Sequence, residues 1–159
     1  MCIRDRYDLV LFSESFQYVN IRKSFEKIPS LLNDNGKLLI CDFFRQPGTG
    51  TKPLGGGHDW KVFQDHLNSF PFNNILDIDI TRETARTYDL IDKIINDVAL
   101  PVRDLSSTYL SSQYPKGMRL LKWFFRKKIN RMNRIYFKGN MKGEMFNKLK
   151  TYRILLYDI

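Results

Sequence analysis

Two short apolar runs, joined by one amphipathic segment, constrain the fold of this chain more than any other feature. YDLVLF begins at Tyr7 and predicts a strand over 7–12, and KLLICDFF predicts a second strand over 37–43. Both runs have the length and apolar character of strands buried in a parallel sheet. The segment between them predicts a helix that Pro29 shortens or kinks, and DNGK predicts a turn at Gly36. Strand, helix, turn and strand together predict one βαβ unit with parallel strands.

The rest of the chain adds two strands and a long helical region. A loop rich in Gly and Pro at 45–57 precedes a predicted helix, HDWKVFQDHLNSF, with large apolar residues on one face. NNILDIDIT alternates, which predicts a strand over 75–80 with one face in water. Residues 82–135 indicate several helices, and YRILLYDI predicts a last strand over 152–157. The sequence therefore predicts an α/β fold of four strands, with a large helical insertion between the last two.

Composition limits the class of protein. The 159 residues favour one domain, and 43% hydrophobic with 14% aromatic residues is enough for a packed core. No apolar run reaches the length of about 18 residues that spans a bilayer, and no signal peptide is visible. Cys2 and Cys41 cannot form a metal cluster alone, and Cys41 lies in an apolar run as expected of a buried, reduced thiol. We expect a cytoplasmic location.

The positive charge is concentrated near the C-terminal end. The net charge is +9, but residues 115–153 hold 13 Lys or Arg and one acid, Glu144, a balance of +12, which leaves −3 for the remainder. Residues 119–138 mix these cations with Trp, Phe, Ile and Met. Such a helix commonly packs its aromatic residues onto the fold and leaves its charges in water. It can also lie on an anionic membrane or bind nucleic acid, so a non-catalytic binding module is the alternative function.

Polar side chains follow both strands of the predicted βαβ unit. In open α/β sheets, ligands bind outside the carboxyl ends of the parallel strands. The first strand is followed by Ser13, Glu14, Ser15 and Phe16, and the second strand ends in Asp42, Phe43, Phe44 and Arg45. We expect these residues to share one rim of the sheet with the Gly-rich loop. In the alternative, Ser13 and Ser15 cap the next helix and Glu14 is solvated.

The loop and the helix after it offer one more candidate, His58. Gly55, Gly56 and Gly57 allow close backbone approach, but the patterns of phosphate-binding loops are absent, which argues against a nucleotide site. A helix start disfavours a charged imidazole, so a neutral His58 could act as a general base. The commoner role for such a histidine is capping or surface exposure. His58 and His66 are eight residues apart, which is not a metal-ligand spacing, so we expect no metal.

The order of these elements resembles the C-terminal part of class I S-adenosylmethionine-dependent methyltransferases that act on small molecules. YDLVLFSESFQYV, SLLNDNGKLLICDFF, GGGHDWKVFQDHLNSFPF, DIDIT and FNKLKTYRILLYDI carry the resemblance over residues 7–159, with Lys37 in place of the second glycine of the family's LL-x-x-G-G pattern. The resemblance implies a truncated Rossmann-like sheet of order 4-5-7-6, with the last pair antiparallel, and residues 82–150 as a helical cap. Residues 7–12 would then be an exposed sheet edge.

The resemblance also implies a function. The cofactor would be S-adenosyl-L-methionine, with Ser13, Glu14, Ser15 and Phe16 close to it. A small-molecule acceptor would contact Gln17, Phe43 and Arg45, and His58 or Glu14 would act as base. The family's glycine-rich cofactor motif would lie upstream of Tyr7, so we expect the chain by itself to be inactive. Residues 1–6, MCIRDR, resemble a non-native leader seen in translated metagenomic fragments.

Overall fold

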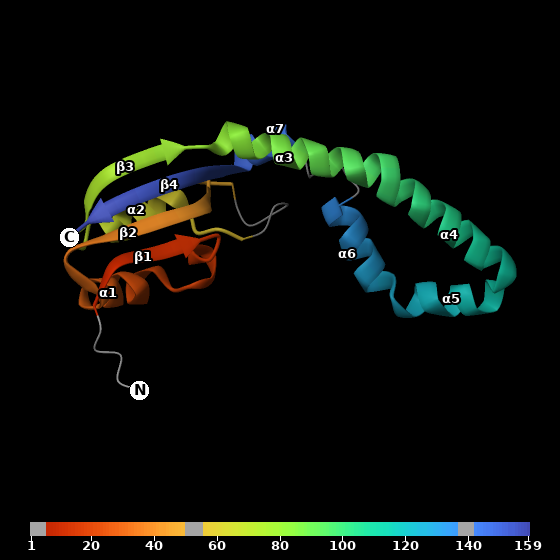
Figure 1. The fold of residues 1–159 in the computed structure, drawn as a ribbon. Helices are drawn as coiled ribbons and strands as arrows, with labels where there is room; N and C mark the ends of the chain where they lie inside the picture. Colours follow the sequence, from red (N-terminus) through yellow and green to blue (C-terminus); the bar gives the residue numbers. More distant parts are fainter. Residues whose placement is uncertain (1–5, 50–55, 137–141) are drawn as a thin grey trace. The chain divides into compact units, whose positions relative to one another are not determined.

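The computed structural model describes residues 6–49, 56–136 and 142–159, and the chain divides into two compact units. The first, unit 1, comprises Met1–Thr84 and Asn147–Ile159, and the second, unit 2, comprises Ala85–Phe146. Each is drawn in Figure 1 in the colours of the sequence. Unit 1 holds the sheet and its helices, and unit 2 is helical. The leader expected at residues 1–6 lies almost entirely outside the described residues.

The sheet of unit 1 has four strands in the order β1-β2-β4-β3. β1 and β2 are parallel, whereas β4 is antiparallel to both β2 and β3. This is the predicted 4-5-7-6 order with its antiparallel last pair, and the predicted α/β class is confirmed. The strands are β1 (Tyr7–Ser13), β2 (Leu32–Arg45), β3 (Asn73–Asp79) and β4 (Lys150–Asp158).

Helices α1 (Ile21–Leu31) and α2 (Trp60–Leu67) cover one face of this sheet (Figure 1). Asn20 and Asp59 cap them by accepting backbone N–H groups, which replaces hydrogen bonds that a helix start lacks. Phe25 of α1 and Phe63 of α2 are fully buried and pack ring to ring at 5.6 Å. Phe63 also contacts the ring of Phe16, so one aromatic cluster joins both helices.

Two local predictions in unit 1 are wrong. DNGK does not separate helix from strand, because β2 already begins at Leu32 and includes Gly36 as part of an irregular pairing with β1. A Cβ on Gly36 would lie 2.9 Å from the carbonyl oxygen of Tyr7, so only glycine fits this close approach. The sequence predicts that β3 buries one face, but all its residues are exposed. β3 is an edge strand of the sheet, and none of its residues belongs to the core cluster.

β1 is the other edge strand of the sheet, as expected. Leu9 and Leu11 are 46% and 57% exposed. They lie on the face opposite α1 and α2, where Leu11 is in register with Leu39 of β2, and Leu39 with Leu156 of β4. An apolar row therefore crosses the uncovered face of the described sheet.

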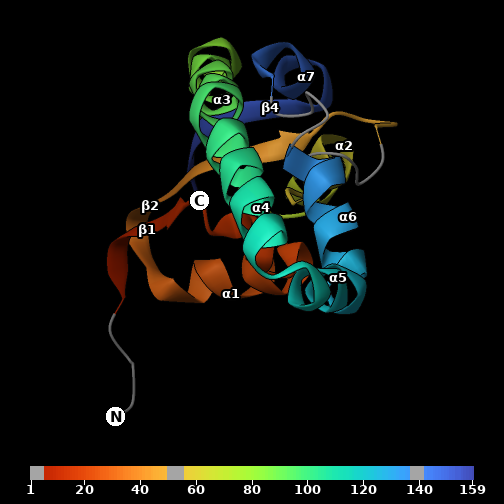
Figure 2. The same ribbon diagram turned by 90° about the vertical axis from the view of Figure 1, so that its right-hand side faces the viewer.

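Unit 2 confirms the prediction of several helices, but their breaks differ from the sequence pattern. The basic helix predicted over 119–138 is interrupted at Phe125, and a π-helix at Ile95–Ala99 joins α3 and α4 into one continuous run. The helices are α3 (Thr81–Ile94), α4 (Leu100–Gln113), α5 (Pro115–Phe124), α6 (Arg126–Tyr136) and α7 (Gly143–Leu149), of which α3 begins and α7 ends in unit 1. Figure 2 shows the chain turning at α5, so that α6 runs back toward α4.

The aromatic cluster predicts a large stability difference between two phenylalanines. Phe63→Ala should lower the free energy of unfolding by about 3–5 kcal/mol, because it opens a cavity among packed rings. Phe124→Ala, at a side chain that is 72% exposed, should change it by less than about 0.5 kcal/mol. Urea unfolding of the full chain, followed by circular dichroism, measures both. Equal losses would contradict the packing of Phe63 described above.

Candidate functional site at the carboxyl ends of β1 and β2

The carboxyl ends of β1 and β2 lie side by side, because the strands are parallel and Ser13 is in register with Cys41. Glu14 follows β1 and donates its backbone N–H to the carbonyl oxygen of Cys41 at 2.8 Å. Its φ is +49°, a left-handed conformation that costs a non-glycine residue about 1–2 kcal/mol. Backbone strain of this kind persists only where the surroundings enforce it, and it is frequent at functional sites.

Asp42, near the end of β2, holds the segment after Glu14 in place. Its carboxylate accepts the backbone N–H of Gln17 at 3.1 Å and that of Phe43 at 2.8 Å. The side chain is 1% exposed, and burial raises the pKa of the Asp42 carboxyl, although the backbone N–H groups that it accepts oppose the rise. Asp42 therefore links the segment after β1 to the end of β2 by hydrogen bonds.

A chain of hydrogen bonds crosses the sheet and ends on the carboxylate of Glu14. The Cys41 thiol donates to the Tyr152 hydroxyl oxygen, with 3.7 Å between sulfur and oxygen, and that hydroxyl donates to Glu14 Oε1 at 2.9 Å. Burial, followed by the bond to Glu14, raises the pKa of the Tyr152 phenol, so the phenol stays protonated and remains a donor. The carboxylate of Glu14 is thus oriented while the residue as a whole stays exposed.

Gly56 and Gly57 form a turn that closes over Phe43. Their φ angles are +82° and +74°, and a Cβ on Gly57 would lie 2.8 Å from the carbonyl oxygen of Phe43. Gly57 donates its N–H to Gln17 Oε1 at 3.3 Å and accepts from Arg45 Nε at 2.9 Å. The expected close backbone approach is present at these two glycines, whereas Gly55 lies outside the described residues.

Lys150, the first residue of β4, contacts the same turn with its side chain. Its Nζ donates to the carbonyl oxygen of Gly56 at 2.5 Å and lies 5.0 Å from the centre of the Phe43 ring. The residue is 2% exposed. Burial, with a smaller effect of the Arg45 charge, lowers the pKa of Lys150 to about 8. A hollow of about 630 Å³, lined in part by Lys150, Gln46 and Asp79, opens beside it.

His58 contacts the segment after Glu14 through the backbone of Phe16 and not through the Glu14 carboxylate. Its Nε2 is 2.9 Å from the carbonyl oxygen of Phe16, which can only accept, so Nε2 carries the proton and Nδ1 is the basic nitrogen of the neutral ring. The ring packs edge-on against Phe16 and lines a second hollow, together with Lys23 and Glu26 of α1 and His66 of α2. No hydrogen bond joins His58 to Glu14 among the described residues.

The structure brings some of the predicted site residues together and separates others. Glu14, Gln17, Phe43 and Arg45 meet around the strand ends, as described above. Ser13 and Ser15 are exposed beside them, and Ser15 makes no side-chain cap to the short 3-10 helix Phe16–Tyr18. Phe16 is 0% exposed, so its ring belongs to the core and only its backbone faces the site. The roles given to these residues stay predictions.

Sequence reasoning missed Tyr152 and Lys150. Both come from β4, more than a hundred positions after Glu14, in the segment FNKLKTYRILLYDI, whose pattern predicts a strand and no site. The one available signal was the polar start of the last strand, Lys150-Thr151-Tyr152, which pairs antiparallel with the end of β2 and so reaches the same edge. Among the described residues, no group of three or more His, Cys, Asp or Glu side chains could hold a metal ion. No helix in the described part of the chain is both long and apolar enough to cross a bilayer.

Comparisons with known proteins identify the fold. No protein-family model matches the sequence, and no curated protein matches it either. Among solved structures, the cyclopropane synthase MmaA2 from Mycobacterium tuberculosis is similar at 11% identity and a TM-score of 0.60, over 98% of this chain and 56% of that one. An O-methyltransferase of a polyketide multienzyme from Brevibacillus brevis, with S-adenosyl-L-homocysteine bound, is similar at 16% identity and a TM-score of 0.52, over 96% and 44%.

Coclaurine N-methyltransferase, bound to N-methylheliamine and S-adenosylhomocysteine, is similar at 13% identity and a TM-score of 0.52, over 99% of this chain and 48% of that one. The chain thus has the fold of class I S-adenosylmethionine-dependent methyltransferases and spans about half the length of these solved chains. The resemblance seen in the sequence is confirmed at the level of the fold.

Lys150 predicts a pH dependence of stability. Its pKa of about 8 in the folded chain lies below the ordinary value of 10.5, so between these values the unfolded chain binds the proton and the folded chain does not. The free energy of unfolding should therefore rise with pH, by about 2 kcal/mol from pH 7 to 9.5. Lys150→Met should remove this rise, and Lys61→Met, at an exposed lysine of α2, should keep it. Urea unfolding across this range decides, and an unchanged slope in Lys150→Met would contradict the burial of the charge.

Proposed function

We propose that this chain is part of an S-adenosylmethionine-dependent methyltransferase that acts on a small-molecule acceptor. The observation that carries the proposal is Glu14, a strained residue whose carboxylate is fixed by Tyr152 at the edge of a methyltransferase sheet where ligands bind. Two of the similar solved chains hold S-adenosylhomocysteine, and one of them also holds a small amine, N-methylheliamine. These similarities support the reaction class and leave the acceptor open.

The residues around Glu14 fit the reactive end of the cofactor. When bound, S-adenosylmethionine supplies a methyl group on a positively charged sulfur. An exposed carboxylate and the half-buried aromatic ring of Phe43 are groups that attract such a cation. The free oxygen of Glu14, the one that Tyr152 does not bond, is the group that we assign to this contact. Ser13 and Ser15 flank it with hydroxyls, and Phe16 can contribute only its backbone.

The protein's contribution would be alignment together with removal of a proton. Gln17 is held on both sides, since its side chain donates to the Glu14 carbonyl oxygen at 3.4 Å and accepts from Gly57. This positions it to orient an acceptor along the line of transfer. Glu14 is the better placed of the two candidate bases, because His58 faces the hollow beside α1 and α2. His58 would act only through Nδ1, on an acceptor that enters from that side.

We further propose that residues 7–159 are the C-terminal part of one methyltransferase domain and that the helical insertion, residues 82–150, selects the acceptor. The share of the solved chains that this chain spans, about half, supports the first point. The second point rests on chain order, because the insertion separates β3 from β4 and begins directly after the strand whose end carries Asp79. Within unit 1, Arg45 and Phe43 are the residues that we assign to the acceptor.

The test is a calorimetric titration with S-adenosylmethionine and with S-adenosylhomocysteine, which lacks the sulfonium charge. It uses the 159-residue chain and a form extended by the region that precedes it in the source DNA. We expect the extended form to bind both compounds. Glu14→Gln should reduce the preference for the charged compound about fivefold, the value of an exposed ion pair of about 1 kcal/mol.

The control is Glu26→Gln, which removes the same charge from the exposed side of α1 and should leave the preference unchanged. Loss of affinity for both compounds to the same extent in Glu14→Gln would assign Glu14 a structural role only. If neither compound binds to the extended form while circular dichroism shows it folded, the proposed function is wrong.

A further inference from the structure

The junction of α5 and α6 in unit 2 exposes an apolar surface, here called the α5–α6 patch. Its members are Leu120, Leu121, Trp123, Phe124 and Phe125, which are 67%, 50%, 72%, 72% and 46% exposed. The rings of Trp123 and Phe124 are 6.2 Å apart, and those of Phe124 and Phe125 are 5.8 Å apart. Large side chains of this kind are normally the most buried in a folded chain, so five in sequence proximity mark a binding surface.

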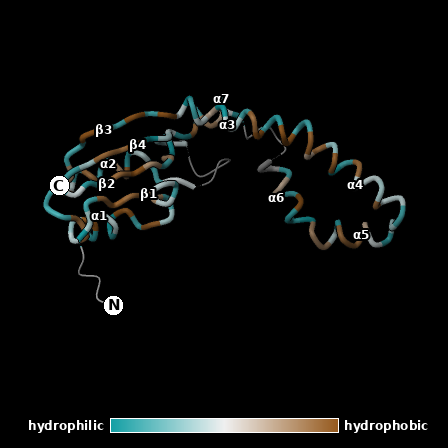
Figure 3. Tube along the Cα trace, in the orientation of Figure 1, coloured by the Kyte–Doolittle hydropathy of each residue, from teal (hydrophilic) through white to brown (hydrophobic). Residues whose placement is uncertain are grey.

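The segment that carries the patch is rich in cations and contains no acid. Between residues 116 and 131 the sequence has seven Lys or Arg and no Asp or Glu. All seven are exposed, and the salt bridges found in the described part of the chain include none of them. They are Lys116, Arg119, Lys122, Arg126, Lys127, Lys128 and Arg131. Apolar and charged positions alternate along both helices at helical spacing (Figure 3).

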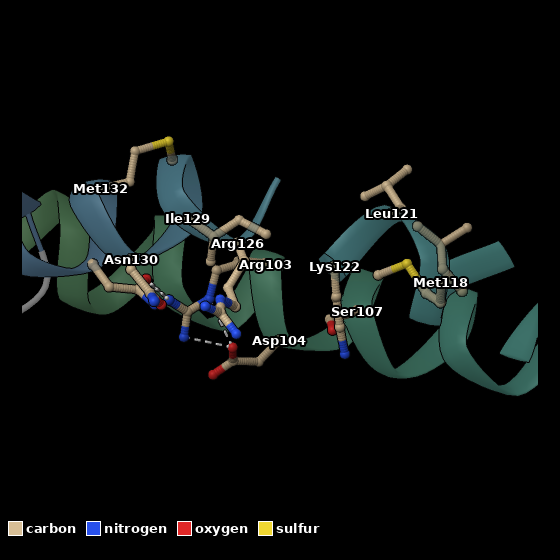
Figure 4. Close-up of a pocket in the computed structure, with 12 residues that line it drawn as sticks. Arg103, Asp104, Ser107, Met118, Leu121, Lys122, Arg126, Ile129, Asn130 and Met132 are labelled. Carbon is tan, nitrogen blue, oxygen red and sulfur yellow. Dashed lines mark hydrogen bonds and ion pairs between the residues drawn. The ribbon is translucent and has the colours of Figure 1, made fainter. Parts of the chain in front are cut away.

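The helices that carry the patch are tied to α4. Arg103 of α4 donates to Asn133 of α6 at 3.3 Å and is paired with Asp104 at 2.7 Å. Figure 4 shows Arg103 and Asp104 beside Arg126, in a hollow of about 610 Å³ that residues of all three helices line. Asp104 pairs with Arg103 from within α4 and is not salt-bridged to a cation of α5 or α6 among the ion pairs of the described residues. The α5–α6 patch therefore lies on helices of which α6 is hydrogen-bonded to α4.

We propose that the α5–α6 patch binds the surface of a lipid bilayer that contains anionic lipids. A helix with aromatic and aliphatic side chains on one side and Lys and Arg on the other lies in the plane of a membrane interface. Trp is favoured at the level of the headgroups, and each basic residue near an anionic surface adds to the attraction. The proposal is independent of methyl transfer, because it uses no residue of unit 1.

The composition of the patch distinguishes a bilayer from nucleic acid. Both partners would attract the cations, and aromatic rings can stack on bases. Leu120 and Leu121 gain nothing from stacking, whereas the apolar boundary of a bilayer buries them. Binding would be peripheral, because α5, with 10 residues, is about 15 Å long and a bilayer core is about 30 Å thick.

The fluorescence of Trp123 gives a direct measurement. The chain has two tryptophans, so Trp60→Phe leaves Trp123 as the reporter in the full chain. In buffer its emission should be that of water-exposed indole. Vesicles of phosphatidylcholine with phosphatidylglycerol should shift the emission to shorter wavelength, vesicles of phosphatidylcholine alone should shift it far less, and raised salt should weaken the effect.

Matched variants separate the charges from the apolar side chains. Replacing Lys122, Arg126, Lys127 and Lys128 by Gln should lower vesicle partitioning on the order of 100-fold or more, at about fivefold per charge. The control replaces four exposed lysines of unit 1 by Gln and should partition like the parent chain. Those lysines are Lys23, Lys27, Lys37 and Lys61. Trp123→Ser with Phe124→Ser should also weaken partitioning, measured by vesicle sedimentation.

Three outcomes would overturn the proposal. Emission of Trp123 that is already short in wavelength, and unchanged by vesicles, would show that the protein itself covers the patch. Equal partitioning of the unit 2 variant and the unit 1 control variant, each with four cations replaced by Gln, would show a nonspecific charge effect. A DNA duplex that binds the chain with unchanged affinity after Trp123→Ser and Phe124→Ser, and that displaces it from vesicles, would identify nucleic acid as the partner.

Discussion

The burial of Phe16 is the interaction on which the rest of unit 1 depends. Its ring contacts Phe12 of β1, Phe25 of α1, Phe63 of α2 and His58, so it joins β1, both helices and the segment before α2. Phe16 follows Glu14 by only two residues. Because a fully buried ring cannot move without opening the core, the segment after β1 is held at a fixed position above the sheet edge.

This anchoring explains how Glu14 keeps a strained backbone. The residue is fixed on one side by β1 and its bond to Cys41, and on the other by Phe16 and by the bond between Gln17 and Asp42. The strain is therefore imposed by groups that belong to the core. The carboxylate of Glu14 is held by a third element, because it accepts a hydrogen bond from Tyr152 of β4. Residues of three strands thus fix one exposed carboxylate. A loop with a structural role alone would not require the backbone strain at Glu14.

The sequence predicted the elements that rest on local pattern and missed those that rest on distant contacts. YDLVLF and KLLICDFF are strands because apolar runs of that length fit a buried sheet, and the family resemblance supplied their order. Gly36 looked like a helix end, yet it lies in β2, because Tyr7 approaches it from another strand. The rim was placed correctly through Glu14 and Phe43. Tyr152 and Lys150 could not be placed, because only the antiparallel pairing of β2 with β4 brings them there.

The position of β4 has a consequence for how the chain acquires its fold during synthesis. β3 pairs with β4 and with no other strand of the described sheet, and about seventy residues, all of unit 2 among them, separate the two in sequence. β3 therefore has no hydrogen-bonding neighbour in the described sheet until β4, which follows the helices in the chain, has been synthesised. Asp77 of β3 likewise obtains its ion-pair partner, Arg153, only once β4 has been made. The aspartates of β3, Asp77 and Asp79, should discourage its pairing with other chains before β4 is available.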